Sequence, residues 1–275
     1  MNMQHSDKMK LSLDRDAIWS QLRDEARAAV AGEPLLGALI HAGLMHHQSL
    51  EAALAYRFSL KLASGEMSEQ ILREIADQAY ADMPALGDAA RADLMAVYDR
   101  DPATNRLIQP VLFYKGFQAL QAYRMGHWLW RQGRRDMAYY VQMRCSECFG
   151  VDIHPAARIG TGVMIDHAHS IVIGETATVG NDVSMLHSVT LGGTGKEDGD
   201  RHPKIGDGVL IGAGAKVLGN IRVGDNSRIA AGSVVLHEVP RCKTVAGVPA
   251  RVIGDAGCPE PSHSMNHLLG AESYP

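Results

Sequence analysis

Hydrophobic positions follow two different repeats, one in each half of the chain. In the first half, apolar residues recur at intervals of three and four, as in Ile18, Leu22 and Ala26. This spacing places apolar side chains on one face of an α-helix. Proline and glycine residues separate several such segments, so the pattern predicts a bundle of helices over residues 1–145.

The second half carries an aliphatic residue or methionine at every sixth position. The repeat comprises Ile153, Ile159, Ile165 and Ile171, then Ile173, Val179, Met185 and Leu191, and finally Ile205, Ile211, Val217, Val223, Ile229 and Val235. A six-residue period is typical of a short strand followed by a tight corner, three of which form one triangular coil. The pattern predicts a left-handed parallel β-helix of about five coils, from near Val151 to near Ile253.

Composition changes where the repeat changes. Nine of the 28 glycines lie in residues 1–150 and seventeen in 151–254, and this second segment contains no Phe, Trp or Tyr. Glycine tolerates the left-handed backbone of tight corners, and a narrow prism has little room for aromatic rings. We therefore expect an α+β protein: an α-helical domain over 1–145, a β-helix domain over 146–254 and a flexible tail over 255–275.

One insertion interrupts the six-residue repeat. Leu191 and Ile205 are fourteen positions apart, and the sequence between them is GGTGKEDGDRHPK. A polar, glycine-rich insertion in a regular solenoid is usually a loop over one face, where repeat proteins often place binding residues. We expect an extruded loop that contributes to function.

Charge, hydropathy and cysteine content argue against several classes of protein. The 27 Lys and Arg residues nearly balance 31 Asp and Glu residues, so the chain lacks the basic character of a nucleic-acid-binding protein. No segment approaches the roughly 18 apolar residues of a membrane span, and no apolar signal segment opens the chain. Four cysteines are too few for a disulfide framework. We expect a cytoplasmic protein without nucleic-acid or membrane partners.

Longer motifs resemble those of bacterial serine O-acetyltransferases, a family of hexapeptide-repeat acyltransferases. They are VDIHPAARIGTGVMIDHA, SVTLGGTGKEDGDRHPKIGDGVLIGAGAKVLGNI and AGVPAR, together with RDPA and YKGFQALQAYRMGHWLW in the helical half. The resemblance implies acetyl transfer from acetyl-CoA to the hydroxyl of L-serine, giving O-acetyl-L-serine and CoA, the first step of cysteine biosynthesis. It also implies inhibition by L-cysteine at the serine site.

The resemblance assigns His167 as the catalytic base and Asp152 as the carboxylate that orients its imidazole. The chemistry agrees, because a serine hydroxyl is a poor nucleophile at neutral pH and histidine is well matched to the task of a general base. The two residues are fifteen positions apart, less than one coil of eighteen, so they could pair within one chain or across a subunit boundary.

Substrate-binding roles also follow from the resemblance. Arg201 and His202 would bind the carboxylate of serine, and arginine can hold a carboxylate through two hydrogen bonds. Asp101 and Asp166 would bind the amino group and hydroxyl. Acetyl-CoA would lie in a groove between neighbouring β-helices, and no metal is expected. The predicted contacts with acetyl-CoA are Gly193, Ala213, Ala231, Ala246 and Gly247.

Three other functions fit the sequence less well. A sugar acetyltransferase of the same superfamily would have a shorter N-terminal extension. A zinc carbonic anhydrase on the same β-helix would need three converging histidines, and His167, His169 and His187 lack that family's spacing. A non-catalytic scaffold would not require Asp152, His167 and Arg201 together.

Assembly is the last property that the sequence addresses. Flat-faced β-helices tend to form trimers, and the resembled family pairs trimers through the helical domain, so we expect a hexamer. In much of that family the chain ends in Ile, and this tail inserts into the active site of O-acetylserine sulfhydrylase. Here the chain ends at Pro275, which argues against the equivalent complex.

Overall fold

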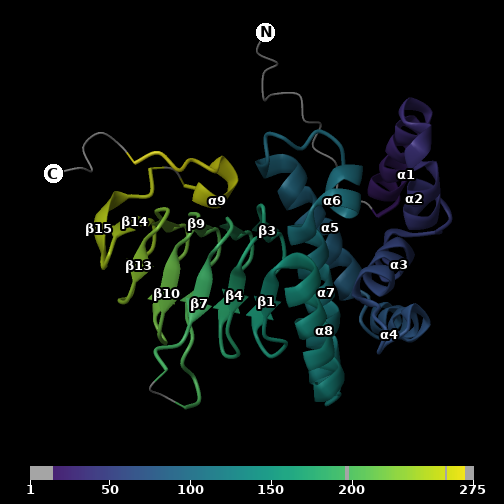
Figure 1. Cartoon of the computed structure of the whole chain (residues 1–275). Helices are drawn as coiled ribbons and strands as arrows, with labels where there is room; N and C mark the ends of the chain where they lie inside the picture. The colour runs from purple at the N-terminus through teal and green to yellow at the C-terminus, as the bar shows by residue number, and fades with distance from the viewer. Residues whose placement is uncertain (1–14, 196–197, 258, 270–275) are drawn as a thin grey trace, which may run out of the picture.

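The computed structural model describes residues 15–195, 198–257 and 259–269. A group of N-terminal helices packs against one end of a β-helix, and the strands of the β-helix lie one behind another away from the helices (Figure 1). The predicted order of helices followed by a parallel β-helix is confirmed. Within the described ranges, no helix is both long and apolar enough to cross a lipid bilayer.

The helical part is built from amphipathic segments that bury the predicted apolar faces. Ile18, Leu22 and Ala26 are fully buried. Gly150, in the left-handed conformation with φ of 68°, ends the last helix, which extends past the expected boundary at 145. The elements are α1 (Arg15–Gly32), η1 (Pro34–Leu36), α2 (Gly37–Ile40), η2 (His41–Met45), α3 (Leu50–Leu62), α4 (Glu69–Asp82), α5 (Ala85–Arg100), α6 (Ile108–Phe113), α7 (Lys115–Arg131) and α8 (Arg135–Phe149).

Three sheets form the faces of the β-helix, and every strand except β15 pairs in parallel with a strand one coil away. Sheet A contains β1 (Val151–Ile153), β4 (Ile171–Ile173), β7 (Thr190–Gly192), β10 (Lys216–Leu218) and β13 (Val234–Val235). Sheet B contains β2 (Arg158–Ile159), β5 (Thr178–Val179), β8 (Lys204–Ile205) and β11 (Arg222–Val223). Sheet C contains β3 (Met164–Ile165), β6 (Ser184–Met185), β9 (Leu210–Ile211), β12 (Arg228–Ile229), β14 (Lys243–Gly247) and β15 (Ala250–Asp255).

The six-residue repeat forms the core of the β-helix. Ile153 pairs with Ile173, and Ile173 pairs with Leu191, so the repeated side chains stack from coil to coil. These residues are buried, and stacking them along the axis makes one continuous aliphatic core. The glycine-rich insertion projects beyond the end of β7, as predicted for an extruded loop (Figure 1).

The β-helix ends differently from the expected run to near Ile253. The last parallel partner in sheet C is β14, and β15 then turns back to pair with β14 in the antiparallel direction. Beyond β15, the chain forms the short helix α9 (Pro261–Ser264). The flexible tail expected over 255–275 stays a prediction, and its residues 270–275 lie outside the described part.

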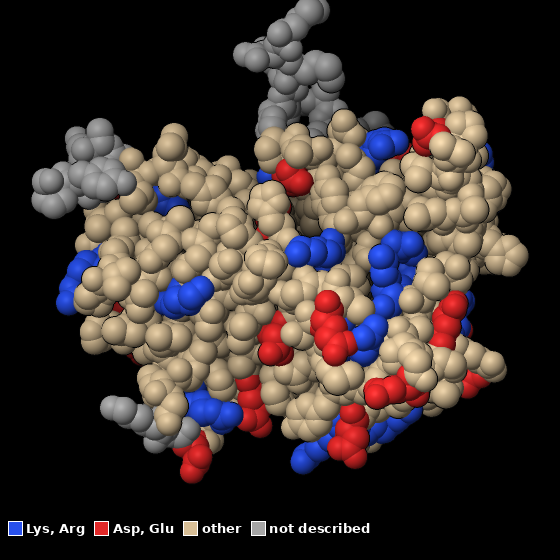
Figure 2. Space-filling view, in the orientation of Figure 1, with Lys and Arg blue, Asp and Glu red and all other residues tan. Residues whose placement is uncertain are grey.

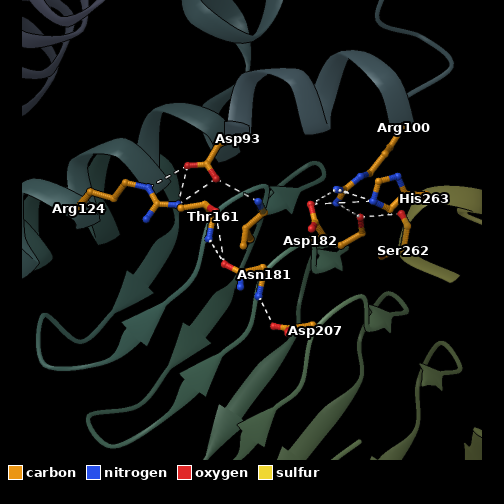
Figure 3. A network of polar contacts seen from close by, with 11 residues as sticks. Asp93, Arg100, Arg124, Thr161, Asn181, Asp182, Asp207, Ser262 and His263 are labelled. Atoms are coloured by element: carbon orange, nitrogen blue, oxygen red, sulfur yellow. Dashed lines mark hydrogen bonds and ion pairs between the residues drawn. The ribbon is translucent and has the colours of Figure 1, made fainter. Parts of the chain in front are cut away.

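A buried ion pair fixes α5 and α7 to the first coil. Asp93 is fully buried and accepts hydrogen bonds from Arg124 Nε at 2.8 Å and Nη2 at 2.9 Å. The same carboxylate accepts the backbone N–H of Val163 at 3.0 Å, and Arg124 donates to the Gly160 carbonyl at 2.7 Å (Figure 3). The two charges are therefore paired with each other and also hydrogen-bonded to the β-helix backbone.

A second polar contact fixes the end of α5. The buried Arg100 donates to Asp182 Oδ1 at 3.0 Å and to Ser184 Oγ at 3.1 Å (Figure 3). Ser184 in turn donates to the Ser262 carbonyl at 2.9 Å, and His263 Nε2 lies 3.1 Å from Arg100 Nη2. The C-terminal end of α5 is thus held against the coil that contains β6 and against α9.

Candidate active site

Most of the predicted site residues of the β-helix lie on two different corners of the triangular prism. The histidine corner joins sheet C to sheet A and consists of residues 166–170, 186–189, 212–215 and 230–233. The arginine corner joins sheet A to sheet B and consists of residues 154–157, 174–177, 193–203 and 219–221. Because the corners lie at opposite edges of sheet A, each presents its own group of side chains.

The first segment of the histidine corner is longer than the others and locally strained. Ile165 and Met185 are paired twenty positions apart, whereas Ile211 and Ile229 are paired eighteen apart. His167, Ala168 and Ser170 have φ of 56°, 54° and 56°, the left-handed region that residues other than glycine rarely adopt. Such strain often accompanies a functional site.

A cavity of about 550 Å³ opens between this corner and the helical part. Asp166 and His167 line it from the β-helix, and Asp101 lines it from the C-terminal end of α5. Tyr114 and Lys115, at the start of α7, complete the polar part of the lining. The structure therefore brings together three of the predicted site residues around one space of a size suited to a small ligand.

Charge in this cavity is mainly acidic. Burial raises the pKa of the Asp166 carboxyl; nearby His167 opposes that rise and the Asp101 carboxylate adds to it. His167 Nε2 lies 3.4 Å from Asp166 Oδ2, and 69% of the His167 side chain is exposed in the single chain. His187 stands one coil further along the corner, with its ring edge-to-face against that of His167 at 5.7 Å.

The α7 helix approaches this corner closely because of one glycine. A Cβ atom at Gly116 would overlap the carbonyl oxygen of Ile165. Glycine therefore lets the first turn of α7 rest on the backbone of β3, directly before Asp166 and His167. Gly116 and Ile165 both line the cavity at this contact.

The arginine corner holds a separate cluster. Arg201 Nη2 donates to Glu175 Oε2 at 2.7 Å, and this hydrogen bond is the main reason why the pKa of Glu175 is lowered. The backbone N–H of Thr176 donates to His202 Nδ1 at 3.2 Å, so in neutral His202 the proton resides on Nε2. Burial, with Arg201 and Lys204 adding to it, lowers the pKa of His202.

Asp152 does not reach His167 in one chain. Its Oδ1 accepts a hydrogen bond from Gln142 Nε2 of α8 at 2.7 Å, on the outer side of sheet A. His167 instead contacts Asp166 and His187. The structure thus separates Asp152, and with it Arg201 and His202, from the cavity that contains His167.

The predicted acetyl-CoA contacts are also divided. Ala213 and Ala231 lie on the histidine corner, joined along the axis by hydrogen bonds from Gly214 N–H to the His187 carbonyl and from Gly232 N–H to the Ala213 carbonyl. They continue the line of His167 and His187. Gly193 lies instead at the base of the extruded loop, and Ala246 and Gly247 end β14.

Several polar residues of these clusters escaped sequence reasoning. Thr104 and Tyr114 stand beside Asp101, and Glu175 and Thr176 support Arg201 and His202. The GET segment after Ile173 lies in a corner of the repeat, but nothing in its spacing indicated a partner in the loop. In the described part of the chain, no group of three or more His, Cys, Asp or Glu side chains is arranged to hold a metal ion.

Both halves of the chain match known protein families. The sequence model described as "Serine acetyltransferase, N-terminal" matches residues 18–122, and that described as "Bacterial transferase hexapeptide (six repeats)" matches residues 202–237. The serine acetyltransferase of Salmonella typhimurium is 53% identical over 256 residues, which cover 93% of this chain and 94% of that protein.

Solved structures give the same picture. The serine acetyltransferase of Vibrio cholerae has a TM-score of 0.91 at 50% identity, covering 93% of this chain and 99% of that chain. A serine acetyltransferase in complex with cysteine has a TM-score of 0.91 at 49% identity, and the match covers 93% of this chain and 99% of that chain. The Brucella abortus enzyme in complex with coenzyme A has a TM-score of 0.86 at 55% identity, and the match covers 88% of this chain and 96% of that chain. The Neisseria gonorrhoeae enzyme in complex with serine has a TM-score of 0.83 at 52% identity, and the match covers 85% of this chain and 96% of that chain.

Proposed function

Since the chain belongs to the serine acetyltransferase family, and is therefore an enzyme that transfers acetyl groups to serine, we propose that His167 is its general base and that serine binds in the cavity beside it. The observation that carries this proposal is the convergence of Asp101, Asp166 and His167 on one cavity of about 550 Å³. The acetyl donor is acetyl-CoA, in keeping with the neighbouring structure bound to coenzyme A.

The reaction needs one base that later acts as an acid. His167 removes the proton from the serine hydroxyl as the oxygen attacks the thioester carbonyl carbon of acetyl-CoA. A tetrahedral intermediate forms, the carbon–sulfur bond breaks, and the CoA sulfur takes the proton from the imidazolium. O-acetyl-L-serine and CoA leave, and His167 returns to its neutral form. Asp152 stabilises the imidazolium during the intermediate steps.

Serine is bound through its two charged groups. The carboxylates of Asp101 and Asp166 attract the ammonium group of serine. Because these two carboxylates make the cavity acidic, the negatively charged carboxylate of serine is disfavoured beside them. Arg201 and the Nε2–H of His202 bind the substrate carboxylate. L-cysteine carries the same ammonium and carboxylate groups, so it inhibits by occupying this site, as the cysteine-bound neighbour suggests.

A complete site requires two subunits. Within one chain, Arg201, His202 and Asp152 lie away from the cavity, so they act on the cavity of a neighbouring subunit. The visible face of the β-helix, which shows sheet A, carries fewer charged side chains than the helical part (Figures 1 and 2). Val172 on this sheet is 41% exposed. Such a face suits packing against another copy in a trimer, and the helical domains then pair two trimers into a hexamer.

Acetyl-CoA lies along the histidine corner. The backbone segments around Ala213 and Ala231 continue the line of His167, which suits an elongated ligand whose thioester must reach the base. Gly193, Ala246 and Gly247 complete the groove from the loop and from β14. Docking to O-acetylserine sulfhydrylase is not part of the proposal, because Pro275, on which that argument rests, lies outside the described residues.

The experiment that tests this function measures release of free CoA thiol from acetyl-CoA with L-serine and with a panel of sugars and amino alcohols. We expect serine-dependent release, and a loss of about a hundred- to ten-thousand-fold in His167→Ala. The matched control is His169→Ala, an exposed histidine of the same corner segment, which should keep its activity. Release with another acceptor alone would disprove the serine assignment, and full activity in His167→Ala would disprove the base.

A further inference from the structure

The carboxylate of Asp101 is held by two donors from the turn that follows α5. Its Oδ1 accepts the backbone N–H of Ala103 at 2.8 Å, and its Oδ2 accepts the hydroxyl of Thr104 at 2.7 Å. The Thr104 backbone N–H also donates to the Asp101 carbonyl at 3.0 Å. Thr104 is fully buried, so its hydroxyl is shielded from competition with bulk water.

A third residue extends this arrangement to α7. The hydroxyl of Tyr114 lies 3.2 Å from Thr104 Oγ1. A threonine hydroxyl has one proton, and an ionised carboxylate can only accept, so the Thr104 proton belongs to Asp101. Tyr114 therefore donates to Thr104. The hydrogen bonds form a relay from Tyr114 through Thr104 to Asp101.

The far end of the relay is fixed to the segment that carries the base. Tyr114 is the residue before α7, and its ring packs against the buried side chains of Val97 and Met164. Two residues later, Gly116 rests on the Ile165 carbonyl, directly before Asp166 and His167. The relay thus links the orientation of Asp101 to the position of the histidine corner.

We propose that Thr104 and Tyr114 are positioning residues that hold the Asp101 carboxylate where it receives the ammonium group of serine. This inference rests on the proposed function. Asp101 terminates a helix, and the relay adds the Thr104 hydroxyl to the Ala103 N–H as a restraint on its carboxylate. Fixing the acceptor in advance spares the ordering cost that a mobile carboxylate would incur when serine binds.

The test uses four variants and the CoA thiol assay. Thr104→Val removes the hydroxyl and keeps the shape, so KM for serine should rise about tenfold while KM for acetyl-CoA stays within twofold. Thr104→Ser restores the hydroxyl and should restore KM for serine. Tyr114→Phe keeps the ring packing and should raise KM for serine about threefold. Thermal denaturation of each variant checks that folding is retained.

The double variant Thr104→Val/Tyr114→Phe decides whether the two residues act in series. Because Tyr114 acts through Thr104, the double variant should show the KM for serine of Thr104→Val alone. Multiplied effects, an unchanged KM for serine in Thr104→Val, or equal changes in both KM values would each overturn the relay. Wild-type protein without serine-dependent thiol release would overturn the proposed function itself, a result distinct from any of these.

Discussion

His127 on α7 shows how one buried histidine connects stability to pH. Its Nδ1 lies 2.8 Å from the Pro155 carbonyl, an acceptor, so Nδ1 carries the proton in the neutral ring. Burial lowers the pKa of His127; the Pro155 hydrogen bond opposes the shift, and Arg131, Arg124 and Arg158 add to it. In the unfolded chain the same ring titrates near its ordinary value of 6.5.

We therefore expect the protein to lose stability as pH falls below about 6.5. Between the folded and unfolded pKa values the unfolded chain binds more protons, so the free energy of unfolding rises with pH and falls on acidification. Burial shifts the pKa of His47 and His202 in the same direction. The melting temperature of the wild-type protein should fall as the pH is lowered from 7.5 to 5.5. The melting temperature of the His127→Gln variant should fall less steeply over the same range. Parallel curves for the two proteins would contradict this role for His127.

Single residues of the site were predictable only where a motif carried them. Asp166 and His167 are adjacent in a recognisable segment, and the structure places both at one cavity with Asp101. Thr104 lies outside the quoted motifs, and Tyr114 opens one of them without any sign in the sequence of its partner. Their importance comes from three hydroxyl and carboxylate groups meeting in space, and that meeting depends on how the turn after α5 packs against α7. Hydrogen bonds between distant segments cannot be read from spacing along one chain.

At the scale of elements, the Asp93–Arg124 pair joins α5, α7 and the first coil. Asp93→Asn should lower the free energy of unfolding by about 3 kcal/mol or more, because it leaves a buried guanidinium without its counter-charge. Denaturant unfolding measures the change. The control is the double variant Asp93→Asn/Arg124→Gln, which removes both charges and should recover part of the loss. An unchanged midpoint in Asp93→Asn would contradict the buried pair as a main attachment.

The elements themselves were largely predictable, with one informative exception. The six-residue repeat identified the strands because every coil buries the same aliphatic position. The sequence shows that the repeat shifts by two residues between Ile171 and Ile173. It does not show where the folded chain accommodates the two extra residues. The pairing places the two extra residues between Ile165 and Val172, in the stretch where His167, Ala168 and Ser170 adopt left-handed conformations. A repeat of aliphatic residues predicts which positions point inward, but it does not predict the length or backbone conformation of the corners between them.

At the scale of the whole molecule, two half-sites on different corners predict complementation between subunits. His167→Ala and Asp152→Ala should each be inactive as pure proteins. When the two are unfolded together and reassembled, about a quarter of the sites combine an intact His167 with an intact Asp152 from different chains, so about a quarter of wild-type activity should return. The thiol assay measures this recovery.

The matched control for complementation pairs His167→Ala with Asp101→Ala. Both residues line one cavity of one chain, so every mixed site keeps a defect and no activity should return. Recovery in this control, or none in the Asp152 mixture, would contradict a site shared between subunits. Light scattering on the same samples reports whether the assembly has the mass of three or six chains.

The regular stacking of coils fixes the distances along the histidine corner. Neighbouring coils are separated by the strand spacing, about 4.8 Å. Ala231 stands three coils from His167, because His187 and Ala213 occupy the coils between them. The distance along the corner from His167 to Ala231 is therefore about 15 Å, which is three steps of the strand spacing. Adding one eighteen-residue coil between Ala213 and Ala231 would lengthen this distance by one step and leave every other corner in register. In the proposed binding mode, the number of coils along this corner therefore sets the length of acyl carrier that the enzyme can accommodate.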